Sequence, residues 1–430
     1  MKTFFQFAER GTTYRRETLA GVTTFLSMAY ILVVNPIILS QAGMDKGALF
    51  TATALSAIVG SLLIGLLANF PIGIAPSMGL NSFFTFSVCI GMGVPWEIAL
   101  TGVFIAGIIF MILSVMKIRE KIINVIPQDL KFAIAGGIGF FVAFIGFKNA
   151  GLVVSNPETF VSIGNLSSPT TLLAVFGFII TLMMLVKGIR GGIFYGMVAT
   201  TIIGMIGGKI DVPHSVIGKV PSLEPTFGVV FTHLGDIFTV EIMAVIFTFL
   251  FVAFFDTAGA LIAVASQAGI MKDNQIPNAG RALLADSASG VAGAIFGTST
   301  TASFVESSAG VAVGGRTGFT SVVIAFCFSI ALFFSPILSV ITPEVTAPAL
   351  IIVGALMATE VRHINWNRLE VVIPSFVTII MMPLTFSVAT GIALGFILYP
   401  FAMISLKKWK EVHPIMYILC GLFIIYFAFS

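Results

Sequence analysis

Residues 297–310 read Gly-Thr-Ser-Thr-Thr-Ala-Ser-Phe-Val-Glu-Ser-Ser-Ala-Gly, a hydroxyl-rich stretch that carries one carboxylate, Glu306. Another irregular stretch, residues 71–82, reads Pro-Ile-Gly-Ile-Ala-Pro-Ser-Met-Gly-Leu-Asn-Ser. In chain order, residues 71–82 are the first irregular stretch and residues 297–310 are the second. At membrane depth such backbone is tolerated only where protein or a water-filled cavity surrounds it. We therefore expect each stretch to be a short extended piece leading into a half-helix, with the two helix N-termini facing each other and offering N–H groups to a polar ligand. A packing seam of small residues is the alternative.

The composition of the whole chain places these stretches in a membrane. Of 430 residues, 57% are hydrophobic and only 10% are charged, which excludes a soluble protein of this size. A spanning helix needs roughly 20 apolar residues, so about 14 spans would occupy about 280 positions. The sequence thus predicts an all-α polytopic membrane protein with short connections. Its 43 glycines and 18 prolines favour close helix packing and interrupted helices.

The apolar runs, read against the residues that separate them, predict the individual spans. In the first half they are 18–40, 49–69, 75–92, 96–116, 131–153, 170–187 and 191–208, and in the second half 239–265, 279–296, 300–313, 317–340, 346–360, 368–386 and 387–406. The polar stretch 209–238 between the halves is the longest predicted loop. One further apolar run, 413–429, is short for a span and is expected to lie along the interface or to form an extra span.

The two halves resemble each other. Glu17-Thr-Leu-Ala-Gly-Val-Thr-Thr-Phe-Leu-Ser-Met-Ala-Tyr30 aligns with Glu241-Ile-Met-Ala-Val-Ile-Phe-Thr-Phe-Leu-Phe-Val-Ala-Phe254, which matches span 1 with span 8. Because an odd number of spans separates the copies, they enter the membrane from opposite sides, as in the inverted repeats of secondary transporters. Chance similarity between apolar helices is the alternative interpretation. The predicted fold is a 7+7 inverted repeat in which spans 3 and 10 are broken.

The basic residues predict the orientation, because cytoplasmic loops are enriched in Lys and Arg. With the N-terminus in the cytoplasm, all Lys and Arg residues fall on the cytoplasmic side except Lys46, Lys148, Lys209 and Lys219. The first span follows a charged start without a cleavage signal, so we expect no cleaved signal peptide.

Most of the 19 acidic residues lie at the ends of predicted spans or in loops, but Asp256, Asp286 and Glu306 do not. Asp256 follows the apolar run Phe-Val-Ala-Phe-Phe in span 8, and Glu306 is in the second irregular stretch. An ionised carboxylate within the membrane costs at least about 2.5–3.5 kcal/mol, so each is expected to face a site and to bind substrate, carry a proton, or both. A carboxyl group capped by nearby hydroxyls, for packing alone, is the alternative. Asp286 lies nearer a helix start, five residues after Arg281, where a helix-end or ion-pair role is equally expected.

The spacing of the cysteines and histidines does not indicate a metal site or a disulfide. Cys89, Cys327 and Cys420 lie in apolar runs without CxxC or Cys/His spacing. The four histidines fall in loops or at span ends, and neither a P-loop nor an HExxH motif is present. We therefore predict no cofactor, no metal site, no catalytic residue and no enzymatic activity.

At three motifs the chain resembles the nucleobase–ascorbate transporter superfamily, and within it the azaguanine-resistance-like group of adenine/guanine/hypoxanthine permeases. The motifs are Ala75-Pro-Ser-Met-Gly-Leu-Asn81-Ser-Phe-Phe, Phe255-Asp256-Thr-Ala-Gly and residues 297–310, and the resemblance runs from residue 15 to about residue 406. It implies a core domain of spans 1–4 and 8–11 and a gate domain of spans 5–7 and 12–14. In this chain those divisions are 1–116 and 239–340 for the core, 117–208 and 341–406 for the gate, 209–238 for an extracellular linker, and 407–430 for a C-terminal segment.

The resemblance also implies the site. The two substrate acids of the family correspond to Asp256 and Glu306, and the polar residue of span 3 corresponds to Asn81. The expected substrate-binding set is Glu306, Asp256, Asn81, Ser82, Phe304 and Val305, with Asp256 and Glu306 also coupling protons. The chain departs from uracil- and xanthine-type relatives, which carry a Gln-His pair in span 1, because it has Leu26-Ser27-Met28-Ala29 there. That difference argues against xanthine or urate.

Together these observations predict a secondary active transporter that imports purine bases (hypoxanthine, guanine or adenine) by proton symport across the plasma membrane. Its expected partners are the base, protons and membrane lipid, with a homodimer left open and no nucleic acid. A neutral planar base presents N–H donors and ring-nitrogen acceptors that carboxylates and an amide can pair with, and Phe304 or Phe255 could supply an aromatic face. An anion carrier of the same architecture is the first alternative, although two carboxylates would repel an anion; a channel and a membrane enzyme are the others.

Overall fold

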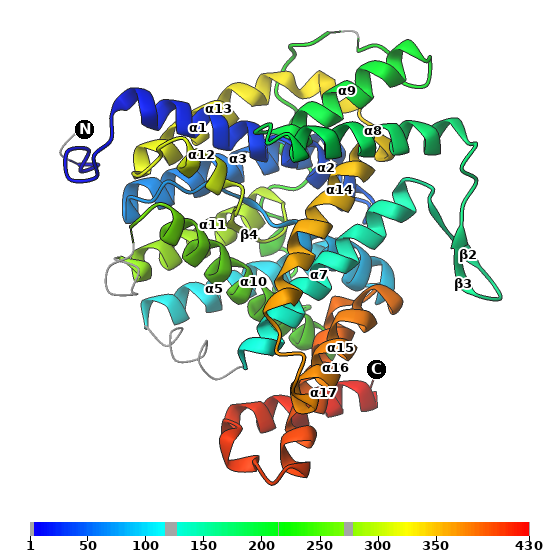
Figure 1. Cartoon of the computed structure of the whole chain (residues 1–430). Helices are drawn as coiled ribbons and strands as arrows, with labels where there is room; N and C mark the ends of the chain where they lie inside the picture. The colour runs from blue at the N-terminus through cyan, green and yellow to red at the C-terminus, as the bar shows by residue number, and fades with distance from the viewer. Residues whose placement is uncertain (1–3, 117–126, 214, 271–277, 430) are drawn as a thin grey trace.

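The computed structural model describes residues 4–116, 127–213, 215–270 and 278–429, and in this part the chain is predominantly helical (Figure 1). The first half contains α1 (Tyr14–Met28), α2 (Ile31–Ser40), α3 (Lys46–Leu63), η1 (Ile64–Ala68), β1 (Ile74–Pro76), α4 (Met78–Ser82), η2 (Phe83–Gly91), α5 (Trp96–Val115), α7 (Gln128–Asn149), β2 (Val153–Asn156), β3 (Phe160–Ile163), α8 (Pro169–Val186) and α9 (Gly192–Ile206).

The second half contains α10 (Val240–Gln267), α11 (Ala279–Phe296), β4 (Thr301–Ser303), α12 (Ser307–Ala312), α13 (Gly318–Ala331), η4 (Leu332–Val340), α14 (Pro343–Ala358), η5 (Thr359–His363), α15 (Leu369–Leu384), α16 (Val388–Ser405), η6 (Trp409–Glu411) and α17 (Pro414–Phe429). Some side chains within these helices, most of them in α10 and α17, lie outside the described part of the chain. Between α9 and α10 the described residues form only the short 3-10 turn η3 (Val229–Phe231), which confirms the long loop predicted at 209–238.

The helix ends follow ordinary capping chemistry. Thr13 caps α1 by accepting a hydrogen bond from the backbone N–H of Arg16, and Asp45 caps α3 by accepting one from Ala48 at 2.7 Å. Pro36 lies inside α2, where its ring lacks a donor and crowds the carbonyl of Leu32. The chain predicted as the span 18–40 remains one candidate membrane span, Tyr14–Ser40, in which a turn at Ala29 and Tyr30 separates α1 from α2.

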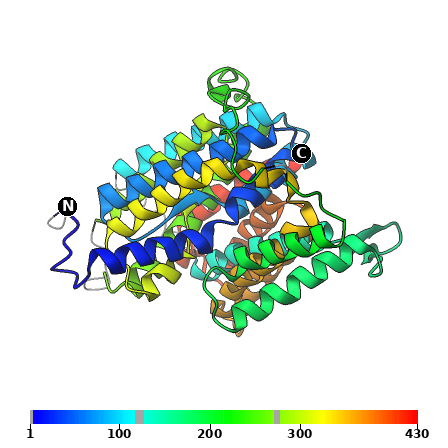
Figure 2. The same cartoon turned by 90° about the horizontal axis from the view of Figure 1, so that it is seen from above.

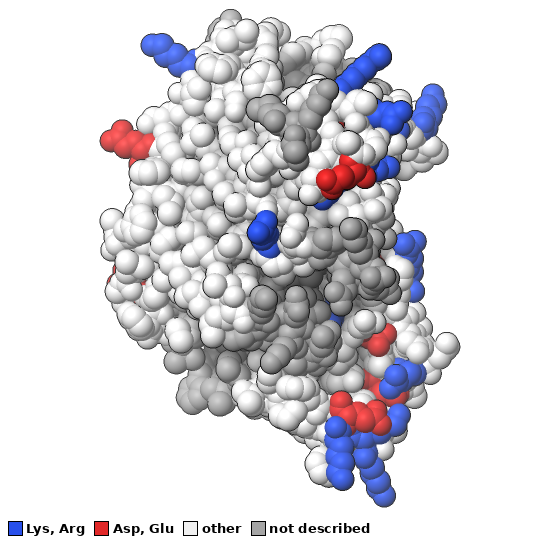
Figure 3. Space-filling model, turned by 90° about the vertical axis from the view of Figure 1, so that its left-hand side faces the viewer, with Lys and Arg blue, Asp and Glu red and all other residues white. Residues whose placement is uncertain are grey.

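In the described part of the chain, seven helices are long and apolar enough to cross a membrane, and several shorter helices are also apolar. Helix α8 illustrates the membrane-facing pattern: Leu172, Phe176, Ile179 and Met183 are exposed at helical spacing on one face. Figure 3 shows a face that is mostly uncharged, with most of its visible charged side chains along the right-hand side and lower end. The full fourteen-span inverted repeat remains a prediction.

The helices pack in two groups. In the first group, α1 packs against α12 and α13, α3 packs against α11 and α13, and α5 packs against α10 and α11. In the second group, α7 packs against α14 and α15, α8 packs against α9 and α14, and α15 packs against α16. Figure 2 shows α8 and α9 set apart from the parallel helices α1, α3 and α13.

A buried carboxylate holds the first group together. Glu17, on α1, accepts hydrogen bonds from the backbone N–H groups of Arg316 at 2.9 Å and Thr317 at 3.3 Å, and from the hydroxyl of Thr320. These donors lie at the start of α13, where a carboxylate also complements the helix dipole. Glu17, which the repeat alignment singled out, therefore ties α1 to α13.

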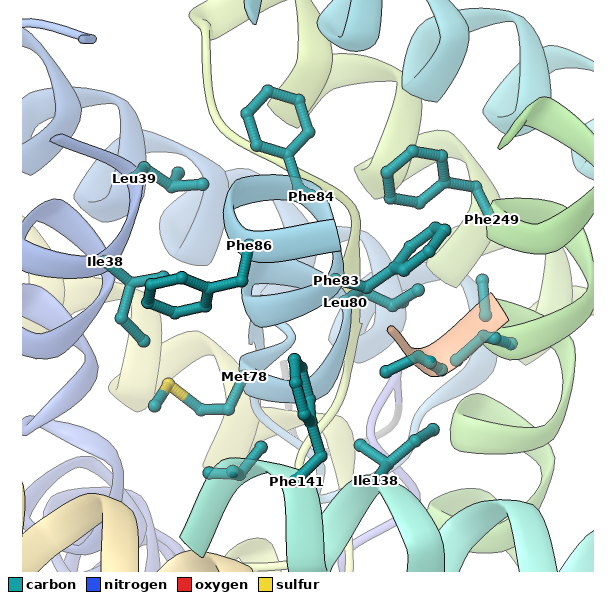
Figure 4. Packing of buried hydrophobic residues seen from close by; sticks show 14 of the residues in the cluster. Ile38, Leu39, Met78, Leu80, Phe83, Phe84, Phe86, Ile138, Phe141 and Phe249 are labelled. Atoms are coloured by element: carbon teal, nitrogen blue, oxygen red, sulfur yellow. The ribbon is translucent and has the colours of Figure 1, made fainter. Parts of the chain in front are cut away.

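The first irregular stretch lies where the two groups meet. Helix α4 and its π-helical continuation η2 pack between α10 and α7, as Figure 4 shows. Phe83 contacts Phe249 of α10 with ring centroids 4.9 Å apart. Gly79 allows the close approach to α7, because a Cβ there would lie 2.5 Å from Cγ2 of Ile138.

Candidate functional site

The two irregular stretches are joined by a short antiparallel ladder. Strand β1 pairs with β4 so that Ile74 lies opposite Ser303 and Pro76 lies opposite Thr301. Beyond the strands, the N–H of Ser77 donates to the carbonyl of Thr300 at 2.9 Å, and the N–H of Phe304 donates to Gly73 at 2.9 Å. The strand followed by a short helix predicted in both stretches is therefore present, and the pairing brings residues 73–77 and 300–304 together.

Hydroxyl groups satisfy backbone donors around the ladder that no strand partner reaches. The hydroxyls of Ser307, Ser321 and Ser61 accept from the N–H groups of Gly73 at 3.0 Å, Ile72 at 2.9 Å and Ile74 at 3.2 Å, respectively. Irregular backbone within a membrane protein needs such internal partners. The serines therefore explain how an extended chain can persist among buried helices.

Glu306 lies at the start of α12 and is partly buried. Its Oε1 accepts a hydrogen bond of 2.7 Å from the hydroxyl of Tyr30, at the break between α1 and α2. Tyr30 is only 1% exposed, so the phenol is held in place by packing and can orient the carboxylate. The two residues before Glu306 differ: Phe304 is buried, whereas Val305 is 53% exposed.

Asn81 and Ser82 lie in α4 and are fully buried. The Nδ2 of Asn81 donates to Oδ1 of Asn35, whose own Nδ2 donates to Oγ1 of Thr53 at 2.7 Å and of Thr298 at 2.9 Å. This network joins α2, α3, α4 and the start of the second irregular stretch.

Several buried polar atoms on the two stretches, or just beyond the first of them, have no hydrogen-bond partner within the described part of the chain. They are Oδ1 of Asn81, Oγ of Ser82, Oγ1 of Thr85 and Oγ of Ser299. Buried polar atoms in proteins are nearly always hydrogen-bonded, so these four atoms make the paired stretches the candidate place for a polar ligand or water. Three further atoms of this kind lie elsewhere, on α1, α7 and α15.

Asp286 lies inside α11, away from either helix end, and is 1% exposed. Its carboxylate accepts from the hydroxyl of Thr257 on α10 at 2.6 Å and from that of Ser303 on β4 at 3.1 Å. It also lines a small cavity with residues of α5, α10 and β4. Asp286 thus connects α11 to α10 and β4. It lies further inside its helix than the predicted position near a helix start.

Asp256 lies within α10, next to Thr257, but its side chain is outside the described part of the chain, as is that of Phe255. Of the two predicted substrate acids, the structure places only Glu306 among the described side chains. The pairing of β1 with β4 brings the stretch that carries Glu306 next to the stretch that carries Asn81. The placement of the Asp256 carboxylate stays a prediction.

Sequence reasoning missed Tyr30 and Asn35. Asn35 had a signal, because it is a lone amide in the apolar run Ile31-Leu-Val-Val-Asn-Pro36. Tyr30 is the last residue of the aligned repeat segment 17–30, but an aromatic residue in an apolar helix is common and does not by itself indicate a binding site. Only the fold places its hydroxyl against Glu306, a contact that spans 276 positions in the sequence.

Comparison with known proteins extends over the whole chain. The profile of the permease family matches residues 15–394. The chain is 57% identical to guanine/hypoxanthine permease PbuG of Bacillus subtilis (strain 168), with 100% of both chains covered. It is 41% identical to adenine permease AdeP of Escherichia coli (strain K12), covering 99% of this chain and 95% of that one. Among solved structures it is similar to the transmembrane domain of the cyanobacterium bicarbonate transporter BicA, with a TM-score of 0.64 at 16% identity, covering 88% of this chain and 96% of that one. The last likeness concerns the fold alone.

Proposed function

Because this chain belongs to the permease family of nucleobase–ascorbate transporters, we propose that it is a secondary active transporter that imports purine bases together with protons. The substrate assignment rests on one observation, the 57% identity over the full length of both chains to a guanine/hypoxanthine permease. The adenine permease AdeP is less similar, at 41% identity, and the guanine/hypoxanthine permease GhxP is less similar again, at 32%, so the 57% match alone supports the preference. We therefore propose hypoxanthine and guanine as the preferred substrates.

The proposed binding site is formed by Glu306, Asp256, Asn81, Ser82 and Phe304, with Val305 at its exposed edge. A purine base offers N–H donors and ring-nitrogen acceptors in one plane. A carboxylate accepts from two N–H groups, an amide can donate or accept, and a serine hydroxyl can do either. The partnerless polar atoms of Asn81 and Ser82 support this proposal, because a bound base would supply the missing hydrogen bonds.

Proton coupling is proposed for Asp256 and Glu306. A neutral base carries no charge down the membrane potential, so accumulation needs a second, charged species. A carboxyl group that gains and loses a proton as the site opens to each side can link the proton gradient to base movement. The hydrogen bond from Tyr30 supports a role for Glu306, because it holds the carboxyl group in a fixed position beside the paired stretches.

We further propose that the two helix groups are the core and the gate, and that the chain lies in the plasma membrane with its N-terminus in the cytoplasm. The close packing within each group supports this division, since one group can then move against the other as a unit. The paired strands belong to the core, and α4 borders α7 of the gate. A site at this boundary would be exposed to either side by such a movement.

A competition experiment tests the substrate. Purified protein in liposomes takes up labelled hypoxanthine in the presence of excess guanine, adenine, xanthine, uracil or bicarbonate, with protein-free liposomes as the control. We expect guanine to compete most strongly, adenine less, and xanthine, uracil and bicarbonate little. Competition by bicarbonate without competition by purines would instead favour an anion carrier, the class to which the structural neighbour BicA belongs.

A further inference from the structure

Asn35 is a fully buried amide in the middle of α2, and every polar atom of its side chain has a partner within the protein. Both hydrogens of Nδ2 are used, one toward Thr53 at 2.7 Å and one toward Thr298 at 2.9 Å. Its Oδ1 accepts from Nδ2 of Asn81. The side chain thus connects two other helices with the second irregular stretch.

The surroundings of Thr53 fix which way the Asn35 amide points. The hydroxyl of Thr53 donates its only hydrogen to the carbonyl of Leu49 at 2.6 Å, so toward Asn35 it can only accept. Asn35 must therefore turn its NH2 group to Thr53. Its carbonyl oxygen consequently faces Asn81.

This orientation is passed on to Asn81. A carbonyl oxygen only accepts, so Asn81 must direct its NH2 group to Asn35. The Oδ1 of Asn81 is then left as the atom available to a ligand, and it is fully buried without a partner in the described part of the chain. Without Asn35, rotation of the Asn81 amide by half a turn would exchange acceptor for donor at the same point.

We propose that Asn35 is a positioning residue that fixes the Asn81 amide so that it presents an acceptor to the substrate. The inference rests on the proposed function, because Asn81 must contact the base for its orientation to matter. Its consequence is selectivity for a base that carries an N–H group at the position facing Asn81. A ring nitrogen with a lone pair there would meet the Asn81 oxygen and be rejected.

A double-mutant cycle separates positioning from general support of the fold. Hypoxanthine affinity is measured by calorimetry on purified wild-type protein and on Asn35→Leu, Asn81→Ala and the double variant, after their thermal unfolding midpoints are compared. We expect each single substitution to weaken binding about three- to tenfold, as for loss of one neutral hydrogen bond. The double variant should bind no more weakly than Asn81→Ala, because Asn35 acts through Asn81.

If the losses of affinity in the two single variants multiply in the double variant, the proposal is overturned, since Asn35 would then support the site independently of Asn81. If Asn35→Leu does not fold, the cycle is run with Asn35→Thr, whose hydroxyl can donate or accept and so imposes no orientation. Ser56→Ala is the matched control on α3, because among the described residues the Ser56 hydroxyl donates to Ala52 of its own helix, at 2.6 Å. Failure of the wild-type protein to bind any purine would refute the proposed function itself, and with it the premise of this inference.

Discussion

The hydrogen bond between Tyr30 and Glu306 joins residues that are 276 positions apart in the sequence. The carboxylate lies at the end of an extended stretch, and the phenol comes from a break in the first span. Because Tyr30 is buried and donates to the carboxylate, it sets the direction in which Glu306 can accept from a ligand. The substrate role of Glu306 is therefore best tested by removing its charge without changing its shape.

We predict that Glu306→Gln abolishes hypoxanthine binding in protein that remains folded. An amide has one acceptor oxygen in place of two, and its NH2 group would meet the Tyr30 hydroxyl or the donors of the base. Calorimetry on purified protein is the measurement, and Glu158→Gln in the exposed β2–β3 hairpin is the matched control. Near-wild-type affinity in Glu306→Gln would remove this residue from the site.

For Asp256→Asn we predict loss of coupling with retention of some binding. The substitution imitates the protonated carboxyl group permanently, so base affinity should no longer vary with pH and accumulation against a gradient should be lost. Exchange of labelled for unlabelled base across the membrane should persist. A variant that still accumulates hypoxanthine and still responds to a protonophore would transfer the coupling role to Glu306 or Asp286.

At this scale the sequence identified residues whose chemistry is costly in a membrane, such as Glu306, and residues in matched motifs, such as Asn81. It missed Tyr30 and Asn35 because their roles depend on partners far along the chain. Asn35 reaches Thr298 across 263 positions, a contact that no local pattern encodes. The position of Asp286 near a predicted helix start was a poor guide to its contacts, since its partners Thr257 and Ser303 come from two other elements.

At the scale of elements, local chemistry predicted the regular helices well. Helices α5, α7 and α8 begin and end within a few residues of the predicted spans 96–116, 131–153 and 170–187. The extended pieces were also expected from their proline, glycine and hydroxyl content, whereas the π-helical segments η1 and η2 were not. The β2–β3 hairpin was also missed, because its strands of four residues at 153–156 and 160–163 fell in a connection between two strongly apolar runs.

Close helix contacts supply a prediction at this scale. At Gly354, on α14, an added Cβ would lie 2.5 Å from the backbone N of Ala143 and the carbonyl oxygen of Gly139, both on α7. These are backbone atoms, so the two helices must separate to admit a methyl group. We expect Gly354→Ala to destabilise the protein by about 1–3 kcal/mol. The midpoint of thermal unfolding in detergent should fall accordingly.

The matched control is Gly280→Ala, in the first turn of α11, where an added Cβ meets nothing within 4 Å. Because alanine favours a helix over glycine, its unfolding midpoint should stay the same or rise. If both variants unfold at the wild-type temperature, the close packing of α7 against α14 does not contribute to stability as described.

For the whole molecule, composition alone predicted a membrane protein. The proposed division of its helices into a core and a gate came instead from the family resemblance and from the packing of the helices in two groups. Orientation rests on the distribution of Lys and Arg and can be tested with two exposed lysines, Lys187 and Lys219. They flank helix α9, the one described helix of membrane-like composition between them. If α9 crosses the membrane, the two positions lie on opposite sides.

We predict that Lys219→Cys reacts with an impermeant thiol reagent on intact cells and that Lys187→Cys reacts only after permeabilisation. Both substitutions are made in a background from which Cys89, Cys327 and Cys420 have been removed. The reverse pattern would invert the proposed orientation. Reaction of both from outside would mean that Gly192–Ile206 does not cross the membrane.

Uptake by purified protein in liposomes tests the central claim, proton-driven transport of a purine base, most directly. Liposomes are placed in labelled hypoxanthine with the outer solution more acidic than the lumen, and the internal concentration is followed with and without a protonophore. We predict saturable accumulation above the external concentration, abolished when the protonophore collapses the pH gradient. Saturable uptake that stops at the external concentration regardless of the gradient would contradict proton coupling, and absence of saturable uptake would contradict the transporter itself.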